Sequence, residues 1–336
     1  MLNCTPRKGS RLLGEIELET EPVKINPDIT FEKVYETFEK WMHKPNQNAI
    51  KIAISCVVSN ELKGDPVWMF LVAPPGGSKT EILSAFDKCS NVFITSSLTP
   101  HSLISGAAFK NDIDLSLIPQ LNGKTLMIKD FTSILGKREN EKDEIFGILR
   151  DAYDGKCGKV FGNGLHRYYK SHFSILGGVT PSIYELSSQY AGLGERFLKF
   201  FIGDNLIHIG EESIILRSMR NVNKEISMRE ELAEVVKDYV TLLTENMKKE
   251  DFELPKMSEE IEKRIVACAQ FVARMRAVVN RDRINSDMIL SKPSAEVGSR
   301  IGKQLTRIAL SLAIVNLRKE INEQDLKILR KIALDT

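Results

Sequence analysis

The sequence lacks the features that mark secreted, zinc-binding and membrane-spanning proteins. Its five cysteines lie far apart and include no CxxC pair, which indicates reduced thiols rather than disulfides or a zinc site. The chain has no apolar run of about 18 residues, and its N-terminus has no apolar core of signal-peptide length. We therefore expect a soluble, cytoplasmic protein with no membrane partner.

A surplus of charge of one sign is absent as well. The chain has 47 Lys and Arg residues against 45 Asp and Glu residues, a net charge of +2. Bulk electrostatics therefore do not indicate a nucleic-acid binder, and any such surface must come from local clusters. With 336 residues, 42% of them hydrophobic, the chain is long enough for two or three folded domains.

Hydrophobic patterning divides the chain into three parts. Residues 1–29 are polar and interrupted by proline, which predicts an N-terminal arm without a core of its own. Residues 30–215 begin with two apolar helices, the first capped by Thr30, and continue with apolar runs that alternate with helical patterns. Residues 216–336 are charged and helix-periodic, which predicts a helical second domain.

The short apolar runs of the middle part predict the fold class. Five of them have the length of strands and most are separated by helical patterns. This alternation predicts an α/β fold with a mostly parallel five-stranded sheet, covered by helices on both faces. The predicted strands are 67–72, 92–96, 125–130, 173–179 and 197–202.

The segment after the first predicted strand has the layout of a phosphate-binding loop. A turn rich in proline and glycine leads from the strand to Lys79, Thr80 and a helix. In such loops backbone N–H groups surround the phosphates, the lysine reaches the β and γ oxygens, and the hydroxyl holds Mg²⁺. The predicted ligands are ATP and Mg²⁺, and the predicted binding residues are Ala73, Pro74, Pro75, Gly76, Gly77, Ser78, Lys79, Thr80 and Glu81.

This loop departs from the usual motif at two positions. The motif has glycine at its first position and directly before the lysine, where this chain has Ala73 and Ser78. The alternative interpretation is a glycine-rich turn that only joins a strand to a helix.

Polar residues at the ends of two later strands are candidates for the rest of an ATPase site. Asp130 follows the apolar run of KTLMIKDF, where a nucleotide hydrolase needs a carboxylate to hold Mg²⁺ or to orient the attacking water. Thr180 ends the following strand and could hydrogen-bond the γ-phosphate or its water. The alternatives are a surface aspartate for Asp130 and a helix N-cap before Pro181 for Thr180.

Arg196 follows a glycine-containing turn and directly precedes the last predicted strand. An arginine at this place could act as a finger that stabilises transition-state charge across a subunit boundary. The alternative is a salt bridge with the neighbouring Glu195.

Five ordered segments together resemble the ATPase module of AAA+ proteins, and within that group the MCM-like (minichromosome maintenance) helicases, including versions carried by viruses and mobile elements. The resemblance runs from Thr30 to the end of the chain, and its segments are APPGGSKT, LMIKDF, SILGGVTP, LGERF and SRIGKQLTRIALSLA. It implies an αβα core at 30–215, a helical lid at 216–336 and assembly into a ring, expected to be a hexamer. It also implies the cytoplasm of a bacterium, an archaeon or a viral host cell.

The resemblance also implies roles for particular residues. The sensor-1 strand of MCM proteins ends in Asn where this chain has Thr180, and their trans-acting arginine lies in an SRF segment that matches Arg196 and its neighbours. Their sensor-2 arginine stands seven residues before a second arginine, the spacing of Arg300 and Arg307. The implied catalytic set is Lys79, Asp130, Thr180, Arg196 and Arg300, with Thr80 and Asp130 as metal ligands.

One departure affects the expected chemistry. The MCM acidic pair before phenylalanine becomes Lys129 and Asp130, so a single carboxylate would serve both metal and water unless another acid such as Glu81 helps. Hydrolysis could therefore be slow.

A hairpin that projects a lysine into the central channel of MCM proteins corresponds here to residues 156–170. Two β-prone runs around Gly162, Asn163 and Gly164 predict the hairpin. Basic residues with interleaved aromatics suit phosphate contacts and base stacking on single-stranded DNA, and the alternative is a solvated hairpin with charged edges. The predicted DNA-binding residues are Lys156, Lys159, His166, Arg167 and Lys170.

The expected function is an ATP-hydrolysing AAA+ motor, a helicase or translocase in the replication of a virus or mobile element. Its expected partners are copies of itself, single-stranded DNA and replication proteins. The alternative is an AAA+ switch or loader with weak hydrolysis that acts on a protein partner, and a third interpretation is a binding protein that uses the loop only structurally.

Overall fold

The computed structural model describes residues 28–107, 114–184, 196–203, 211–277, 279, 282, 287–292 and 295–336. Apart from residues 28 and 29, the predicted N-terminal arm lies outside these ranges.

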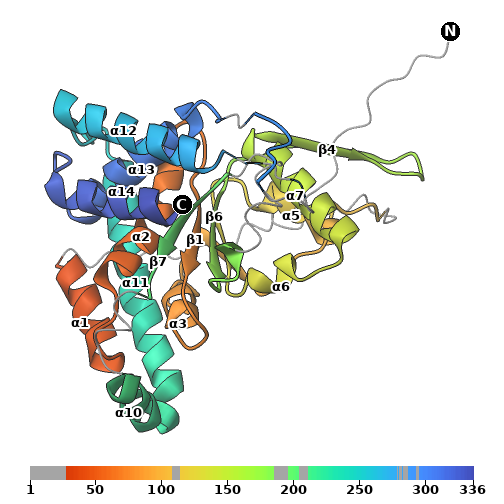
Figure 1. The fold of residues 1–336 in the computed structure, drawn as a ribbon. Coiled ribbons are helices and arrows are strands. Elements are labelled where there is room, and N and C mark those ends of the chain that lie inside the picture. The colour runs from red at the N-terminus through yellow and green to blue at the C-terminus, as the bar shows by residue number, and fades with distance from the viewer. Residues whose placement is uncertain are drawn as a thin grey trace.

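A parallel sheet of five strands forms the centre of the molecule (Figure 1). Its strand order is β2-β3-β6-β1-β7, and every neighbouring pair is parallel. The α/β class and the five-stranded sheet predicted from the sequence are therefore confirmed. The strands are β1 (Trp68–Val72), β2 (Val92–Thr95), β3 (Thr125–Ile128), β6 (Ser174–Val179) and β7 (Phe197–Phe201).

Helices cover both faces of the sheet because side chains alternate along each strand. Met69 and Leu71 of β1 belong to one apolar core, whereas Trp68, Phe70 and Val72 belong to the other. The first core is shared with α1 (Phe31–Trp41), α2 (Gln47–Val58), α3 (Lys79–Ser84), α11 (Glu225–Met247), α12 (Glu259–Met275), α13 (Ser299–Val315) and α14 (Glu323–Asp335). The second is shared with α4 (Pro100–Leu103), α5 (Leu117–Gln120), α6 (Thr132–Leu135) and α7 (Glu139–Tyr153).

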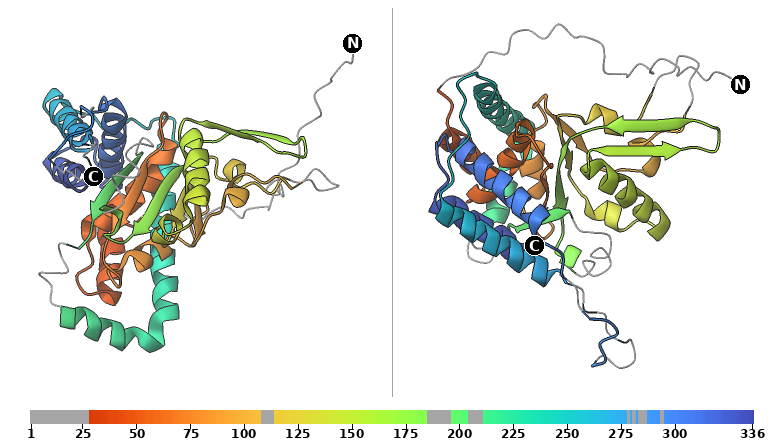
Figure 2. Two further views of the ribbon diagram at one scale, coloured as in Figure 1. Left: turned by 45° about the vertical axis from the view of Figure 1, so that its right-hand side comes forward. Right: turned by 90° about the horizontal axis from the view of Figure 1, so that it is seen from above.

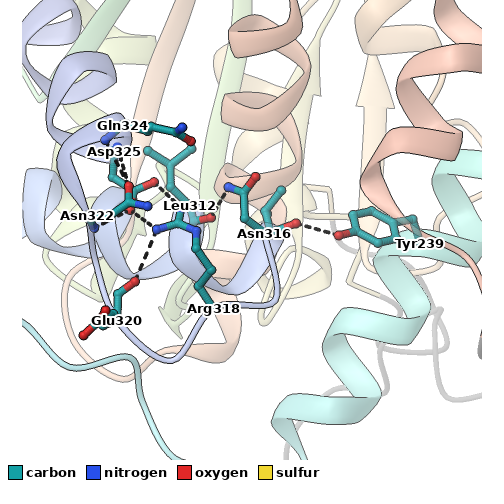
Figure 3. Close-up of polar contacts among 9 residues, drawn as sticks. Tyr239, Leu312, Asn316, Arg318, Glu320, Asn322, Gln324 and Asp325 are labelled. Carbon is teal, nitrogen blue, oxygen red and sulfur yellow. Dashed lines mark hydrogen bonds and ion pairs between the residues drawn. The ribbon is translucent and has the colours of Figure 1, made fainter.

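The C-terminal helices form as the sequence pattern predicts, and polar contacts fix their connections. Asn322 caps α14 by accepting from the backbone N–H groups of Gln324 and Asp325, at 3.0 and 3.4 Å. Arg318 pairs with the buried Asp325 carboxylate at 2.6 Å, and the Tyr239 hydroxyl donates to the Val315 carbonyl (Figure 3). These bonds satisfy polar groups at the helix ends that would otherwise be buried without partners.

The end of α14 covers the free side of the edge strand β7. The backbone N–H of Lys199 donates to the Thr336 hydroxyl at 2.8 Å, and that of Phe201 donates to the Asp335 carboxylate at 2.7 Å. These bonds occupy N–H groups that an exposed edge strand would leave open to another chain. The helical region therefore packs directly on the sheet.

Two elements extend from this body. The antiparallel hairpin of β4 (Lys156–Val160) and β5 (His166–Lys170) follows α7 and projects away from the sheet (Figures 1 and 2). The helix α10 (Glu211–Asn221) lies beside the start of α11 and buries none of its side chains. The predicted hairpin is thus present, with its turn at residues 161–165.

Candidate functional site

The predicted phosphate loop leaves the sheet at its carboxyl edge. β1 lies between β6 and β7, so the loop after Val72 emerges beside the ends of both neighbouring strands. Gly77 N–H donates to the Pro74 carbonyl at 3.0 Å and closes the turn, and α3 begins at Lys79. The segment therefore joins a buried strand to a helix N-terminus, the arrangement that presents backbone N–H groups to an anion.

The backbone of this loop explains why glycine is usual before the lysine. Ser78 has φ of 66°, in the left-handed region, and Gly76 has φ of 75°. Left-handed backbone costs roughly 1–2 kcal/mol for a residue with a side chain. Ser78 therefore holds a strained conformation that glycine would adopt without that cost.

Lys79 folds back onto its own loop. Its Nζ donates to the carbonyl oxygens of Ala73 and Pro74, at 2.6 and 3.1 Å. Burial lowers the pKa of the Lys79 ammonium, and the Asp130 carboxylate opposes this shift. Lys79 and Asp130, far apart in the sequence, therefore lie within electrostatic range of each other.

Asp130 and Thr180 lie at adjacent strand ends and are joined through Thr132. The Thr132 backbone N–H donates to Asp130 Oδ1, and the Thr180 N–H donates to Thr132 Oγ1, each at 3.1 Å. The strands approach closely here, because a Cβ on Gly178 would lie 2.6 Å from the Lys129 carbonyl oxygen. The structure therefore brings together two of the predicted site residues, and Asp130 is exposed.

Glu81, considered as a second carboxylate, already has a partner. Arg229 of α11 binds it with two nitrogens, at 2.8 and 3.2 Å. Lys129, which stands where the resembled family has an acid, pairs with Asp87 at 3.6 Å. Asp130 is therefore the candidate for the carboxylate that acts on the nucleotide.

The residues fit a magnesium ion that arrives with a nucleotide. Thr80 and Asp130 are exposed and supply one hydroxyl and one carboxylate, and Mg²⁺ prefers few protein ligands together with water and phosphate oxygens. Within the part of the chain that the structure describes, no cluster of three or more His, Cys, Asp or Glu could hold a metal. The protein alone therefore offers no complete metal cage there.

A cavity of about 280 Å³ opens beside the phosphate loop. Its walls come from the loop, from the segment between α1 and α2, from Ile202 after β7, and from one side of α10 and α11. The residues around it are Trp41–Asn46, Gly76–Ile82, Ile202, Ile214, Arg217, Ser218, Asn221, Glu225 and Met228. The residues of the cavity wall outside 76–81 were not predicted from the sequence. Residues 42–46, for example, have the composition of an ordinary connection between two helices.

Arg196 lies at the opposite, amino edge of the sheet. Phe197 aligns with Trp68, the first residue of β1, whereas the phosphate loop follows the last. The Arg196 side chain is 9% exposed and its Nη2 lies 3.1 Å from Asp154 Oδ2. Its predicted alternative partner, Glu195, lies outside the described residues.

Arg300 lies at this amino edge too. It stands in the first turn of α13 and pairs with Glu296 at 3.8 Å. Burial lowers the pKa of the Arg196 guanidinium, Asp154 opposes the shift, and the charge of Arg300 adds to it. Arg196, the predicted trans-acting arginine, and Arg300, the predicted sensor-2 arginine, are therefore close to each other and separated from the phosphate loop of their own chain.

Two more buried arginines surround them. Arg276 donates to the Phe197 carbonyl at 2.6 Å, and Arg307 donates to the Leu62 carbonyl. The hydroxyl of Tyr153 and Nε2 of His172 are buried in this region without hydrogen-bond partners. Helix periodicity does not tell which arginines fold inward, so the burial of Arg276 and Arg307 at this edge could not be predicted from the sequence.

The hairpin has two different faces. Lys159 pairs with Glu144, and Arg167 pairs with the buried Asp114 at 3.3 Å. Lys156, His166 and Lys170 lie on the other face and are exposed. The five predicted DNA-binding residues are therefore divided between an inner and an outer side.

Aromatic and aliphatic side chains complete the outer face. Tyr168 is 63% exposed and Val160 is 67% exposed, and cross-strand pairing sets Lys156 opposite Lys170 and Val160 opposite His166. On the inner face, the Tyr169 hydroxyl donates to Asp114 at 2.5 Å. Burial raises the pKa of Asp114, but hydrogen bonds from Tyr169 and Ser116 and the charge of Arg167 outweigh it and hold the pKa below its ordinary value.

Comparisons with known proteins add no relative to this description. No protein-family model matches the chain, and a search of curated proteins gives no match. Among the described helices, none has both the length and the apolar character needed to cross a membrane.

Proposed function

We propose that this chain is an AAA+ ATPase that assembles head to tail with copies of itself and moves single-stranded DNA. The observation that carries the proposal is the division of the site between two edges of one sheet. The carboxyl edge has the phosphate loop with Asp130 and Thr180, and the amino edge has Arg196 and Arg300. One chain cannot bring both sets to one nucleotide, whereas a heterologous contact between two copies can.

The strand order supports this proposal. Thr180 directly follows β6, which lies beside β1, and Asp130 follows the end of β3, which lies next to β6. Ligands of open parallel sheets bind outside the carboxyl ends of the strands. The polar residues at these ends are therefore placed to meet a phosphate chain held by the loop.

In the proposed mechanism, backbone N–H groups of the loop bind the phosphates. Lys79 exchanges the Ala73 and Pro74 carbonyls for phosphate oxygens, which are charged and hence stronger acceptors. Thr80 and Asp130 would hold Mg²⁺, which neutralises phosphate charge when it is bound.

Asp130 and Thr180 are assigned to the attacking water and the γ-phosphate. Thr132 holds the two residues at a fixed separation through its N–H and hydroxyl groups. Because Lys129 replaces a second acid, Asp130 alone polarises the water, and we expect modest turnover.

Arg196 of the neighbouring copy stabilises the charge that develops on the γ-phosphate. Its present partner, Asp154, stands two residues before the first strand of the hairpin. Recruitment of Arg196 to a phosphate therefore weakens a contact at the base of the hairpin. The outer face of the hairpin, with Lys156, Lys170 and Tyr168, is the proposed DNA contact.

The experiment that tests this function is steady-state ATP hydrolysis with and without single-stranded DNA, alongside the Lys79→Ala variant. We expect turnover that DNA stimulates and that Lys79→Ala abolishes. Wild-type turnover in that variant would end the proposal.

The second candidate is a switch or loader with weak hydrolysis, in the cytoplasm and with a protein partner. The pairing of Glu81 with Arg229 favours it, because this bond leaves one carboxylate for catalysis. Nucleotide-dependent assembly without stimulation by DNA would select this candidate over the translocase.

A further inference from the structure

We propose that Arg217 of α10 binds the phosphate groups of a nucleoside triphosphate held by the same subunit. The inference rests on the proposed nucleotide site and adds a residue to it. Arg217 lies on the wall of the 280 Å³ cavity that Gly77 and Lys79 also line. It thus faces the same cavity as the phosphate loop, from α10, whereas Arg300 lies at the other edge of the sheet.

The guanidinium of Arg217 has no carboxylate partner within the described ranges. Among the described residues, Arg217 Nη1 donates to one group, the Lys40 carbonyl near the end of α1, at 3.1 Å. A carbonyl is a weaker acceptor than a phosphate oxygen, and the planar fork of arginine can bind two phosphate oxygens at once. Exchange of the carbonyl for a phosphate is therefore favourable.

The two acids of the cavity wall share one arginine as their partner. Glu81 and Glu225 both pair with Arg229, at 2.8 and 3.7 Å. Lys79 and Arg217 bond to carbonyl oxygens instead. Within the described residues, neither Lys79 nor Arg217 forms an ion pair with an acid of the cavity wall, so both cations are available to a polyanion such as triphosphate.

The way α10 is held allows such a change of partner. None of its side chains is buried, and Asn221 donates to the Trp41 carbonyl at 2.7 Å. The helix is thus attached to the end of α1 by side-chain bonds to carbonyls rather than by an apolar core. It can adjust to a ligand at little cost in packing.

The test is equilibrium binding of ATP and of inorganic triphosphate to Arg217→Ala, Arg217→Gln and Arg220→Ala. Arg220 lies one helical turn away on α10 and is not part of the cavity wall, so Arg220→Ala controls for a lost charge. Arg217→Gln keeps a donor for the Lys40 carbonyl and removes the charge. We expect both Arg217 variants to bind each ligand about tenfold more weakly, since charge-assisted bonds are the strong ones.

The outcomes separate this inference from the proposed function. If wild-type protein and Lys79→Ala both fail to bind ATP, the proposed nucleotide site itself is wrong. If wild-type protein binds, Lys79→Ala does not, and the Arg217 variants match Arg220→Ala, only the role of Arg217 is overturned. Weakening in Arg217→Ala with full affinity in Arg217→Gln would overturn it as well, because the bond to α1 rather than the charge would then matter.

Discussion

The two edges of the central sheet hold their charged side chains in opposite ways. At the carboxyl edge, Thr80 and Asp130 are exposed, and the partners of Lys79 among the described residues are carbonyls of its own loop. At the amino edge, the Arg196 and Arg276 side chains are 9% and 8% exposed and have carboxylate neighbours. The carboxyl edge is thus free to take up a ligand, whereas the amino edge is a preorganised cationic cluster.

This difference indicates how the two edges would work together. Buried arginines lose little conformational entropy on meeting an anion, because packing already fixes them. The open loop lacks such packing, so in the proposed mechanism Lys79 moves from its loop carbonyls to phosphate, whereas Arg196 gives up its contact with the exposed Asp154 carboxylate. In the proposed assembly, the responsive half and the rigid half of the site come from two copies of the chain, so mixing experiments test the comparison most directly.

The largest expected effect follows from Arg196→Ala. We expect ATP affinity to stay within about twofold while hydrolysis falls about a thousandfold, the scale for loss of an arginine finger. A random 1:1 mixture with Asp130→Ala should regain activity, since about a quarter of head-to-tail interfaces then join two intact halves. ATPase assays of each variant and of the mixture measure this.

Thermal unfolding of Arg196→Ala and Asp130→Ala is the control, because it shows whether either variant loses activity through loss of the fold. Asp154 is 65% exposed, so water can replace Arg196 around it and the free energy of unfolding should fall by only about 1–2 kcal/mol. A mixture as inactive as its parents would contradict action across an interface.

The next prediction compares the two faces of the hairpin, which begins at the amino edge. The double variant Lys156→Ala, Lys170→Ala should weaken single-stranded DNA binding. The slope of log binding constant against log salt concentration should become shallower by about 1.4, because each lost phosphate contact removes about 0.7. Lys159→Ala with Arg167→Ala removes the same charge from the inner face and should leave the slope unchanged. Fluorescence anisotropy at several salt concentrations measures both, and equal slopes for the two double variants would contradict the division of faces.

The inner face should affect stability instead. In the described structure Asp114 is 2% exposed and has Arg167, Tyr169 and Ser116 as partners. Arg167→Ala should therefore lower the free energy of unfolding by about 2 kcal/mol, because the buried Asp114 carboxylate loses its charged partner. Chemical denaturation measures it, with Lys156→Ala as the exposed control.

Tyr169→Phe tests the same cluster through its pH dependence. The lowered pKa of Asp114 contributes stability that is present above its unfolded pKa of about 3.9 and is lost as pH falls through the folded pKa. We expect Tyr169→Phe to cost about 1 kcal/mol at neutral pH and the difference from wild type to shrink below about pH 4. Tyr168→Phe, on the exposed outer face, should match wild type throughout, and a cost for Tyr169→Phe that is the same at every pH would contradict the assignment to Asp114.

Local patterns were sufficient to predict the strands. The five apolar runs form strands within one or two residues of their predicted bounds, because each is a short and mostly apolar run of the kind that a sheet buried on both faces requires. Thr30 caps α1 as predicted, accepting from Lys33 N–H at 3.3 Å. These features depend on a few neighbouring residues and are therefore visible in the sequence.

Long-range features could not be predicted in this way. The alternation of side chains along its strands gives the hairpin two faces, but it does not show which face packs inward. Arg167 lies on the inner face with its partner Asp114, which is 53 positions away in the sequence. The position of Arg217 on the wall of the same cavity as the phosphate loop could not be predicted either, because α10 has no buried side chain that would reveal its packing. The site residues from Ala73 to Glu81 followed from local chemistry, whereas the remainder of the cavity depends on tertiary contacts.

The smallest expected effect tests the claim that polar contacts at the carboxyl edge do little for stability. Arg229 binds Glu81 through two nitrogens, but its side chain is 50% exposed. Exposed pairs contribute roughly 0–1 kcal/mol and weaken with salt. Arg229→Ala should therefore lower the free energy of unfolding by less than about 1 kcal/mol, and less still at high salt. A loss above about 2 kcal/mol, as expected for Arg167→Ala, would mean that the carboxyl edge is held as firmly as the hairpin base, and the contrast between an open half-site and a rigid one would not stand.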